Sequence, residues 1–368
     1  MSISTVVFEP ALGTSVPVDR LYQIDPLEDR RWSKLLQWHP RASVFHSLAW
    51  LRSLQKTYGY QPVAFTSSPL GEALRDAVLF CAVDSWLTGR RLVSLPFSDH
   101  CSPLVSDAAE SDRFIAALER EFHGRRWKYF ELRPLSLEQS PGDEWNVSGE
   151  YFFHRLDLRP DIDVLFRNFH SSSTQRKIRR AERERLRYVE GSSEALLDAF
   201  YCLLVITRKR HHIPPQPKNW FRNLMESFGN DLKIRVAYKG DRAVAGMLTI
   251  RHKQTLYYKY GGSDPRFHNL GSMHLLYWKS IQDAKGLGLT SLDFGRVDID
   301  QPGLITFKNR WGAVAAPLRY YRFGRSHRSV HGFEPAVSFE RRMISRVCSL
   351  SPSWVLPLWG TLLYKHIG

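Results

Sequence analysis

Cysteine is scarce in this chain of 368 residues, and no CxxC pair or Cys/His group at metal-ligand spacing is present. The neighbouring histidines His211 and His212 also lack a partner at such a spacing. We therefore expect no metal site, no disulfide framework and a reducing compartment. The four cysteines are Cys81, Cys101, Cys202 and Cys348.

Long apolar runs are lacking too. The longest, from Trp354 to Tyr364, is interrupted by Pro357 and Gly360 and is about half of the roughly 20 residues that span a bilayer. The amino terminus has no basic region ahead of an apolar core, as a secretory signal would have. These absences predict a cytoplasmic protein without a membrane-spanning helix.

Several signature motifs are missing as well. The sequence has no Gly-x-Ser-x-Gly turn, no Walker loop and no helix-turn-helix pattern. Covalent catalysis through serine is therefore not expected, and no nucleic-acid-binding fold is indicated.

Acidic side chains are outnumbered, since 37 Asp and Glu face 52 Lys and Arg, which leaves a formal net charge of +15. Such a surface attracts anions: nucleic acid, acidic lipid or phosphate-bearing substrates. The 43% of hydrophobic residues, with 13% aromatics, are enough for substantial cores and exclude a disordered or fibrous chain.

The length and periodicity predict an α/β (α+β) chain with two domains, 1–165 and 166–330, and a basic, aromatic tail, 331–368. The first domain should hold helices at 32–36, 48–58 and 108–124 and strands at 62–66, 77–83, 91–95, 129–132 and 152–158, with a loop at 138–149. The second should hold helices at 173–186, 194–210, 220–228 and 272–284 and strands at 233–238, 243–250, 255–260 and 291–294.

A candidate anion site lies where the strand 255–260 ends in Gly261 and Gly262 and the next helix opens after Gly271 at Ser272. Free backbone N–H groups and the positive end of the helix dipole would face one point there. An ordinary glycine turn between packed elements is the alternative.

Arginines in the helix 173–186 form a second candidate anion site. Arg176, Arg180, Arg183 and Arg187 fall at i, i+4, i+7 and i+11, on one face. This face could bind a diphosphate or a tRNA backbone. A solvated face held by ion pairs with Glu182 and Glu184 is the alternative.

Asp99 and His100 directly follow a predicted strand, where α/β proteins often place working side chains. Either could accept a proton from an attacking ammonium group. A capping turn is the alternative, and Asp107 is a further candidate base.

The chain resembles the FemABX-like branch of the GNAT acyltransferase superfamily in the order of several fragments. They are FHSLAW at 45–50, LPFSDHCSPL at 95–104, RKIRRAERERL at 176–186, YYKYGGSDP at 257–265, DFGR at 293–296 and GLITFKNRWG at 303–312. The resemblance implies two tandem GNAT-like domains with mixed, largely antiparallel sheets flanked by helices. It also implies transfer of an acyl or aminoacyl group to an amine, in cell-envelope or exopolysaccharide assembly.

The resemblance implies roles for particular residues. Lys308 would assist an oxyanion, Tyr260 and the amides from Tyr258 to Gly262 would polarise the attacked carbonyl, and Arg296 would join Arg176 and Arg180 at phosphates. The donor stays open between acyl-CoA and aminoacyl-tRNA, because the stretch from His268 to Met273 has only Gly271 of the usual pyrophosphate-loop glycines. Lys308 could otherwise be an exposed residue beside a packed Trp311.

The expected acceptor bears phosphate or is lipid-linked. A non-catalytic basic module that binds RNA or an anionic membrane is the rival function. The tail, with Arg341, Arg342 and Arg346 ahead of an apolar, Trp-containing segment, could lie at the inner face of the membrane as a peripheral contact, or dock on the body of the protein.

Overall fold

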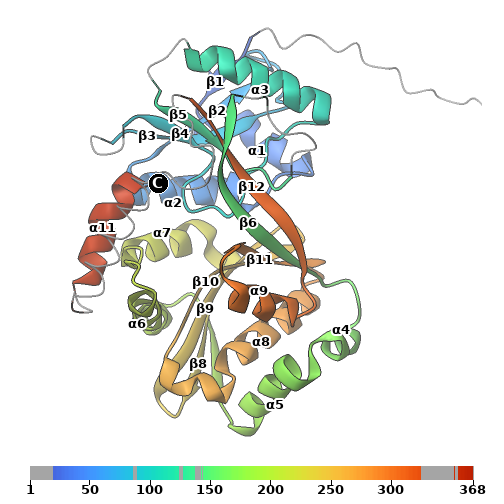
Figure 1. The fold of residues 1–368 in the computed structure, drawn as a ribbon, viewed down its shortest axis with the longest axis vertical. Helices are drawn as coiled ribbons and strands as arrows, with labels where there is room; N and C mark the ends of the chain where they lie inside the picture. The colour runs from blue at the N-terminus through green and yellow to red at the C-terminus, as the bar shows by residue number, and fades with distance from the viewer. Residues whose placement is uncertain are drawn as a thin grey trace, which may run out of the picture.

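One sheet of twelve strands runs through the whole molecule (Figure 1). The computed structural model describes residues 20–85, 89–123, 127–136, 142, 144–324, 352 and 355–367. The strand order is β1-β2-β3-β4-β5-β12-β6-β11-β10-β9-β8-β7. Most neighbouring strands are antiparallel; β4 with β5 and β10 with β11 are parallel.

The predicted elements are largely present. The strands are β1 (Tyr22–Ile24), β2 (Gln61–Thr66), β3 (Val78–Val83), β4 (Arg91–Val93), β5 (Tyr129–Leu132), β6 (Trp145–Asp157), β7 (Arg187–Gly191), β8 (Leu232–Lys239), β9 (Arg242–His252), β10 (Thr255–Ser263), β11 (Ser291–Asp298) and β12 (Val314–Gly324). The helices are α1 (Arg30–Trp38), α2 (Leu48–Tyr58), α3 (Ala108–His123), α4 (Ile162–Asn168), α5 (Arg176–Arg183), α6 (Glu194–Arg210), α7 (Lys218–Phe228), α8 (Ser272–Gly286), α9 (Pro302–Asn309) and α11 (Leu356–Ile367).

Local chemistry explains the sharp ends of α2. Ser47 accepts a hydrogen bond from the N–H of Trp50, which satisfies one of the free donors of the first turn. Gly59 ends the helix with a φ of 74°, a left-handed conformation that glycine adopts without steric cost. Both signals are visible in the sequence, so the prediction of 48–58 is correct.

The two long strands β6 and β12 join two halves of the molecule, as Figure 1 shows. The first half contains β1 to β5, and the second contains β7 to β11. β12 pairs with β6 from Val314 to Phe323 and, on its other edge, with β5 from Tyr321 to Gly324. The sheet of the first half is thus extended by a strand from the end of the second. The predicted loop 138–149 is wrong from Trp145 onwards, where β6 begins, and β12 was not predicted.

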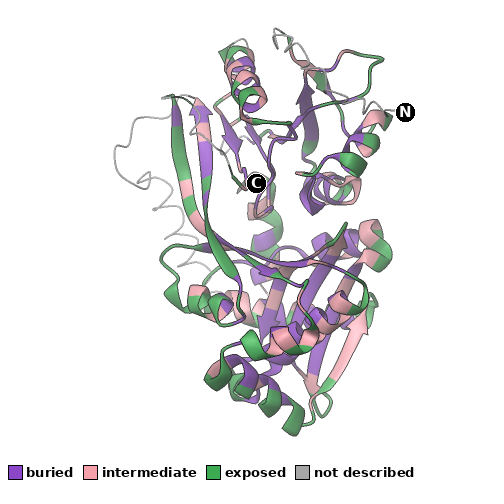
Figure 2. Cartoon of the chain, turned by 90° about the vertical axis from the view of Figure 1, so that its right-hand side faces the viewer, coloured by how far each residue is buried: buried purple, intermediate pink, exposed green. Residues whose placement is uncertain are grey.

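Helices cover the sheet and separate three main apolar clusters. One cluster joins the halves, because α1 and α2 pack with α6, α7 and strands of both halves. A second lies under α4, α5 and α8, and a third under α3. Figure 2 shows the buried strands of the lower half between helices with exposed outer faces. The shared cluster binds the first half to the second through apolar contact as well as through the sheet.

The predicted domain limit at residue 165 falls inside α4. Of the tail, residues 331–351, 353, 354 and 368 lie outside the described residues, and with them Arg341, Arg342, Arg346 and Trp354. None of the described helices is long and apolar enough to cross a membrane.

Candidate active site

The strands β10 and β11 separate partway along their length. They pair in parallel only from Thr255 to Tyr257 on β10 and from Ser291 to Asp293 on β11. Beyond Tyr257, β10 continues beside β9, while the pairing of β11 with β6 shifts register between Asp293 and Arg296. An opening therefore begins between these two central strands beyond Tyr257 and Asp293.

The loop from Leu95 to His100, which belongs to the first half, reaches this opening. Lys259 Nζ on β10 donates to Asp99 Oδ2 at 2.7 Å and to the carbonyl oxygen of Phe97 at 3.2 Å. On the β11 side, Gly295 has a φ of 71°, and a Cβ there would lie 3.2 Å from Asp99 Oδ2. Three distant segments thus converge on the Asp99 carboxylate.

Opposite charges keep Asp99 ionised. Burial opposes the negative charge, but the charge and hydrogen bond of Lys259 and the charge of Arg296 hold the pKa of Asp99 below its ordinary value. The Lys259 ammonium itself lies over the rings of Phe45, at 4.7 Å, and Trp50, at 5.3 Å. Aromatic faces attract a cation, so these rings help to hold Lys259 at the carboxylate.

Arg296 adds a second positive group to the site. Its guanidinium lies over the rings of Tyr151, at 4.2 Å, and Tyr320, at 5.0 Å. The Tyr320 hydroxyl donates to the carbonyl oxygen of Asp99 at 2.6 Å. The long strands β6 and β12 therefore position both Arg296 and the Asp99 loop.

Lys308 is buried, with 2% of its surface exposed, so the alternative of an exposed lysine is wrong. Its Nζ donates to three successive carbonyl oxygens of the β11 bulge: Phe294 at 2.7 Å, Gly295 at 3.0 Å and Arg296 at 3.3 Å. Burial lowers the pKa of Lys308 to about 8, although the nearby carboxylates of Asp99 and Asp293 oppose the shift. In this geometry all three protons of the ammonium group hold the bulge that carries Gly295.

The other candidate bases have different surroundings. His100 is buried, and its Nε2 lies 3.1 Å from Asp293 Oδ2, whose partner oxygen Oδ1 accepts from the N–H of Gly295 at 2.6 Å. Asp107 is exposed and accepts from the N–H of Glu110 at 2.8 Å, at the start of α3. Asp107 thus caps a helix, whereas His100 contacts the bulge indirectly, through Asp293.

The predicted carbonyl-polarising segment is closely packed. The Tyr260 hydroxyl accepts from Trp220 Nε1 at 2.9 Å in the core, and burial raises the pKa of Tyr260 well above its ordinary value. A Cβ on Gly262 would lie 2.6 Å from the backbone of Leu203 and Leu204 on α6. Gly262 therefore allows β10 and α6 to approach closely.

The predicted turn before α8 lies against the basic helix. Gly271 has a φ of 75°, and a side chain there would collide with the carbonyl oxygen of Lys177 on α5. Ser272 is buried at the first turn of α8. Nearby, His268 Nε2 lies 2.9 Å from Ser263 Oγ and 3.3 Å from Arg210. The start of α8 is thus surrounded by positive and hydrogen-bonding groups.

The predicted stripe of four arginines is broken. A π-helix (Ser171–Gln175) precedes α5, and α5 ends at Arg183, so Arg187 belongs to β7. Arg180 pairs with Glu184 at 2.6 Å, as the alternative of a solvated face predicts, and Arg176 is exposed. Arg296 is not beside these arginines but over the tyrosines of β6 and β12.

The structure therefore brings together Asp99, Arg296 and Lys308, around Gly295 and with His100 behind them. It adds Lys259, which the sequence analysis did not single out. The available signal was a lone lysine within the aromatic strand TLYYKYGG, because a charge on a mostly buried strand needs a partner.

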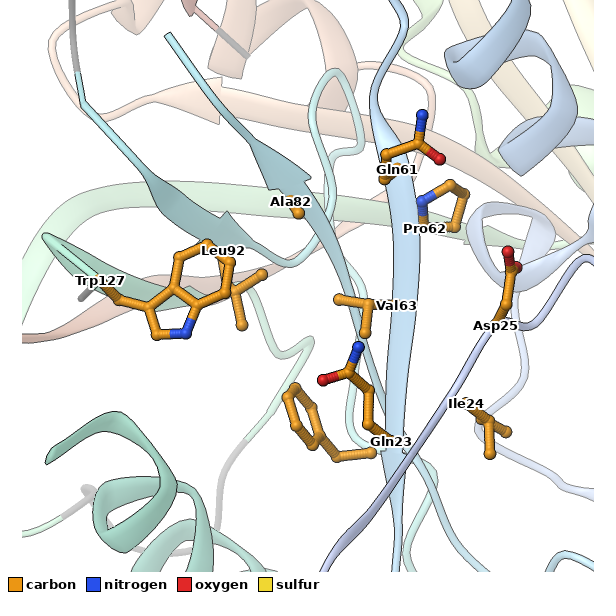
Figure 3. Close-up of a pocket in the computed structure, with 10 residues that line it drawn as sticks. Gln23, Ile24, Asp25, Gln61, Pro62, Val63, Ala82, Leu92 and Trp127 are labelled. Atoms are coloured by element: carbon orange, nitrogen blue, oxygen red, sulfur yellow. The ribbon is translucent and has the colours of Figure 1, made fainter. Parts of the chain in front are cut away.

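A shallow hollow of about 250 Å³ lies elsewhere, on the sheet of the first half, between Gln23, Gln61, Val63 and Trp127 (Figure 3). It contains none of the predicted site residues. Among the described residues no group of His, Cys, Asp or Glu side chains could hold a metal ion.

Comparison with known proteins identifies the second half. Residues 169–308 match the family model described as an acetyltransferase (GNAT) domain. The UDP-N-acetylmuramoylpentapeptide-lysine N(6)-alanyltransferase of Weissella viridescens is 27% identical over 111 residues, 29% of this chain and 33% of that protein. The match thus spans about a third of the length of the curated relative.

Solved structures share the fold across nearly the whole chain. The crystal structure of FemX has a TM-score of 0.61 at 14% identity and covers 82% of this chain and 96% of FemX. A tandem GNAT protein from the clavulanic acid biosynthesis pathway has a TM-score of 0.52 at 11% identity, with 84% and 99% covered. The structure of L-PGS from Bacillus licheniformis has a TM-score of 0.51 at 13% identity, with 88% and 98% covered.

The fold is that of tandem GNAT proteins, and residues 169–308 match a GNAT domain. The family model over residues 169–308, the curated relative and the FemX fold together support the FemABX-like branch of that superfamily. The predicted family and fold class are confirmed, and acyltransferase is the enzyme class that the family model and the curated relative share.

Proposed function

We propose that this protein transfers an activated acyl or aminoacyl group to the amine of an acceptor, by direct attack of that amine. One observation carries the proposal. The Asp99 loop of the first half reaches the opening between β10 and β11 and meets Lys259 and Gly295 there. A carboxylate held ionised where two GNAT strands separate can attract an ammonium group and take its proton.

The donor would enter the opening between β10 and β11. Its phosphates would lie toward the start of α8, where the helix dipole and nearby cations favour negative charge. Lys177 of α5 and Arg210 of α6 are basic residues near that turn, and both charges act on His268. Both acyl-CoA and aminoacyl-tRNA carry phosphates that would suit this end of the site.

In the chemical step, Asp99 would take one proton from the acceptor's ammonium group, and the freed amine nitrogen would attack the carbonyl carbon of the donor. The C–S bond of an acyl-CoA, or the ester C–O bond of an aminoacyl-tRNA, would then break, and the second proton lost by the nitrogen would pass to the departing thiolate or ribose oxygen. The carbonyl oxygen would become negative in the transition state, where nearby positive charge is most effective. Lys308 and Arg296 would supply part of this positive charge. Lys308 would act mainly by fixing the bulge, because its protons are already donated to carbonyl oxygens.

The acceptor would bear phosphate, which the exposed Arg176 of α5 could bind. The name of the curated relative specifies a UDP-linked pentapeptide acceptor, which carries a diphosphate and an amine on the same molecule. We propose an acceptor of this chemical class and a role in the cell envelope.

Replacement of Asp99 tests the proposal. Asp99→Asn should lower the single-turnover rate by about 100 to 10,000-fold, the usual contribution of a general base. The matched control is Asp107→Asn, an exposed cap that asparagine can replace. Equal rates for Asp99→Asn and the wild type would remove Asp99 from the mechanism. If the wild type binds nucleic acid and transfers no group, the rival basic module would be favoured.

A further inference from the structure

The helix α11 is fixed to the body of the protein by one of its faces. Leu356 and Gly360 are buried on this face, and Tyr364 contacts the body. The Tyr364 hydroxyl donates to the carbonyl oxygen of Pro214 at 2.9 Å. The backbone carbonyl oxygen of Tyr364 accepts from the Tyr60 hydroxyl at 2.5 Å. The spacing i, i+4, i+8 puts these residues on one side of the helix.

Further contacts fix the end of α11 to the first half. Arg91 donates to the carbonyl oxygen of His366 at 2.7 Å, and His366 Nδ1 lies 3.1 Å from Ser85 Oγ. The helix therefore touches both halves, and its orientation about its own axis is set. Figure 1 shows α11 along the outer side of the molecule, next to α2, α7 and α6.

The opposite face of α11 is apolar and exposed. Leu358 is 60% exposed, Trp359 37% and Leu362 63%. The fixed inner face prevents these side chains from turning inward. Large apolar side chains grouped on one exposed face mark contact with a membrane or a partner more often than isolated ones do.

The charge on α11 itself is positive. Lys365 is exposed one turn after Leu362, and α11 contains no acidic residue. The neighbouring helix α6 ends in Arg208, Lys209 and Arg210, and the half-exposed Ile213 follows just before the prolines that contact α11. Apolar side chains that include a tryptophan, flanked by basic groups, suit the interface of an anionic bilayer.

We propose that this outer face of α11, formed by Leu358, Trp359 and Leu362, rests on an anionic lipid surface. Lipid contact by this face does not rest on the proposed acyl transfer. It differs from the tail expected from the sequence, because α11 is docked and contacts lipid at the same time. On the docked face, the ring of Tyr364 lies 5.4 Å from that of Phe97, two residues from Asp99.

Charge complementarity favours lipid over a second copy of the chain. Two identical faces that each carry the exposed Lys365 and no acidic residue would repel each other. An anionic bilayer instead attracts each nearby basic side chain.

Cosedimentation of the full chain with phosphatidylcholine vesicles, with and without phosphatidylglycerol, tests the proposal. The wild type should sediment with the anionic vesicles, and less so at high salt. The variant Leu358→Ser/Leu362→Ser should bind at least about tenfold more weakly, because two apolar side chains no longer enter the interface.

The matched control is Leu70→Ser/Leu287→Ser, which removes two leucines that are 77% and 53% exposed elsewhere. It should bind as the wild type does. Equal binding by Leu358→Ser/Leu362→Ser, equal loss by the control, or no binding by the wild type would each overturn the proposal. So would a wild-type dimer that Leu358→Ser/Leu362→Ser converts to a monomer.

Discussion

Asp99 and Lys308 stand in the same small site but are held in opposite ways. Lys259 and Arg296 stabilise the charge on Asp99, whereas burial works against the charge on Lys308. The carboxylate therefore stays ionised at neutral pH. The ammonium group of Lys308 retains its charge there at a cost in stability.

The lowered pKa of Lys308 predicts the direction in which stability changes with pH. In the unfolded chain the pKa returns to about 10.5, so between pH 8 and 10.5 the unfolded state binds more protons and stability rises with pH. Urea unfolding of the wild type and of Lys308→Met should show this rise only in the wild type. We compare the free energy of unfolding of the wild type minus that of Lys308→Met. If this value stays constant or falls from pH 8 to 10.5, the assignment is contradicted.

Two residues of the site differ in how visible they were in the sequence. Asp99 follows a strand and can be suggested from that position alone, whereas nothing local identifies a partner for Lys259 within its aromatic strand. Its partner lies 160 residues away, and only the arrival of the Asp99 loop at β10 makes the pair. Interactions over such separations leave no local pattern.

Among the elements, helices with capping signals were predicted best. α2 and α6 match the predicted limits because serine caps begin both and Gly59 ends the first. The basic helix was predicted too long, since the chain turns after α5 and Arg185 adopts a φ of 51°. The strand β12 was missed because its pairing with β5 joins segments far apart in the sequence.

Close packing of β10 against α6 gives a prediction at Gly262. Gly262→Ala should lower the free energy of unfolding by about 1–3 kcal/mol, because the new methyl group meets helix backbone that cannot rotate away. The control is Gly286→Ala, near the end of α8, where nothing lies within 4 Å and φ is ordinary. That variant should be as stable as the wild type or up to about 1 kcal/mol more stable. Equal stability of both variants in urea titrations would contradict the packing argument.

The molecule as a whole is joined by β6, β12 and the apolar cluster under α2, α6 and α7. The predicted division at residue 165 describes the order of the chain, but the sheet and this cluster cross it. The candidate active site depends on the crossing, because the Asp99 loop and Lys259 come from different halves.

Unfolding should therefore be a single transition. Tryptophan fluorescence and far-ultraviolet circular dichroism should give coincident urea curves, because neither half keeps its sheet edge or its core without the other. Two separated transitions would show that the halves are independently stable. The structural account of the shared sheet would then fail.

The central claim is that the protein forms an amide bond on an acceptor amine. Mass spectrometry of a UDP-linked pentapeptide, incubated with the full chain and either acyl-CoA or aminoacyl-tRNA, measures this directly. The account predicts that the acceptor gains the mass of one acyl or aminoacyl group with one of these donors, and that the gain disappears with Asp99→Asn but remains with Asp107→Asn. No gain with any donor and amine acceptor, or a gain that Asp99→Asn leaves unchanged, would contradict it.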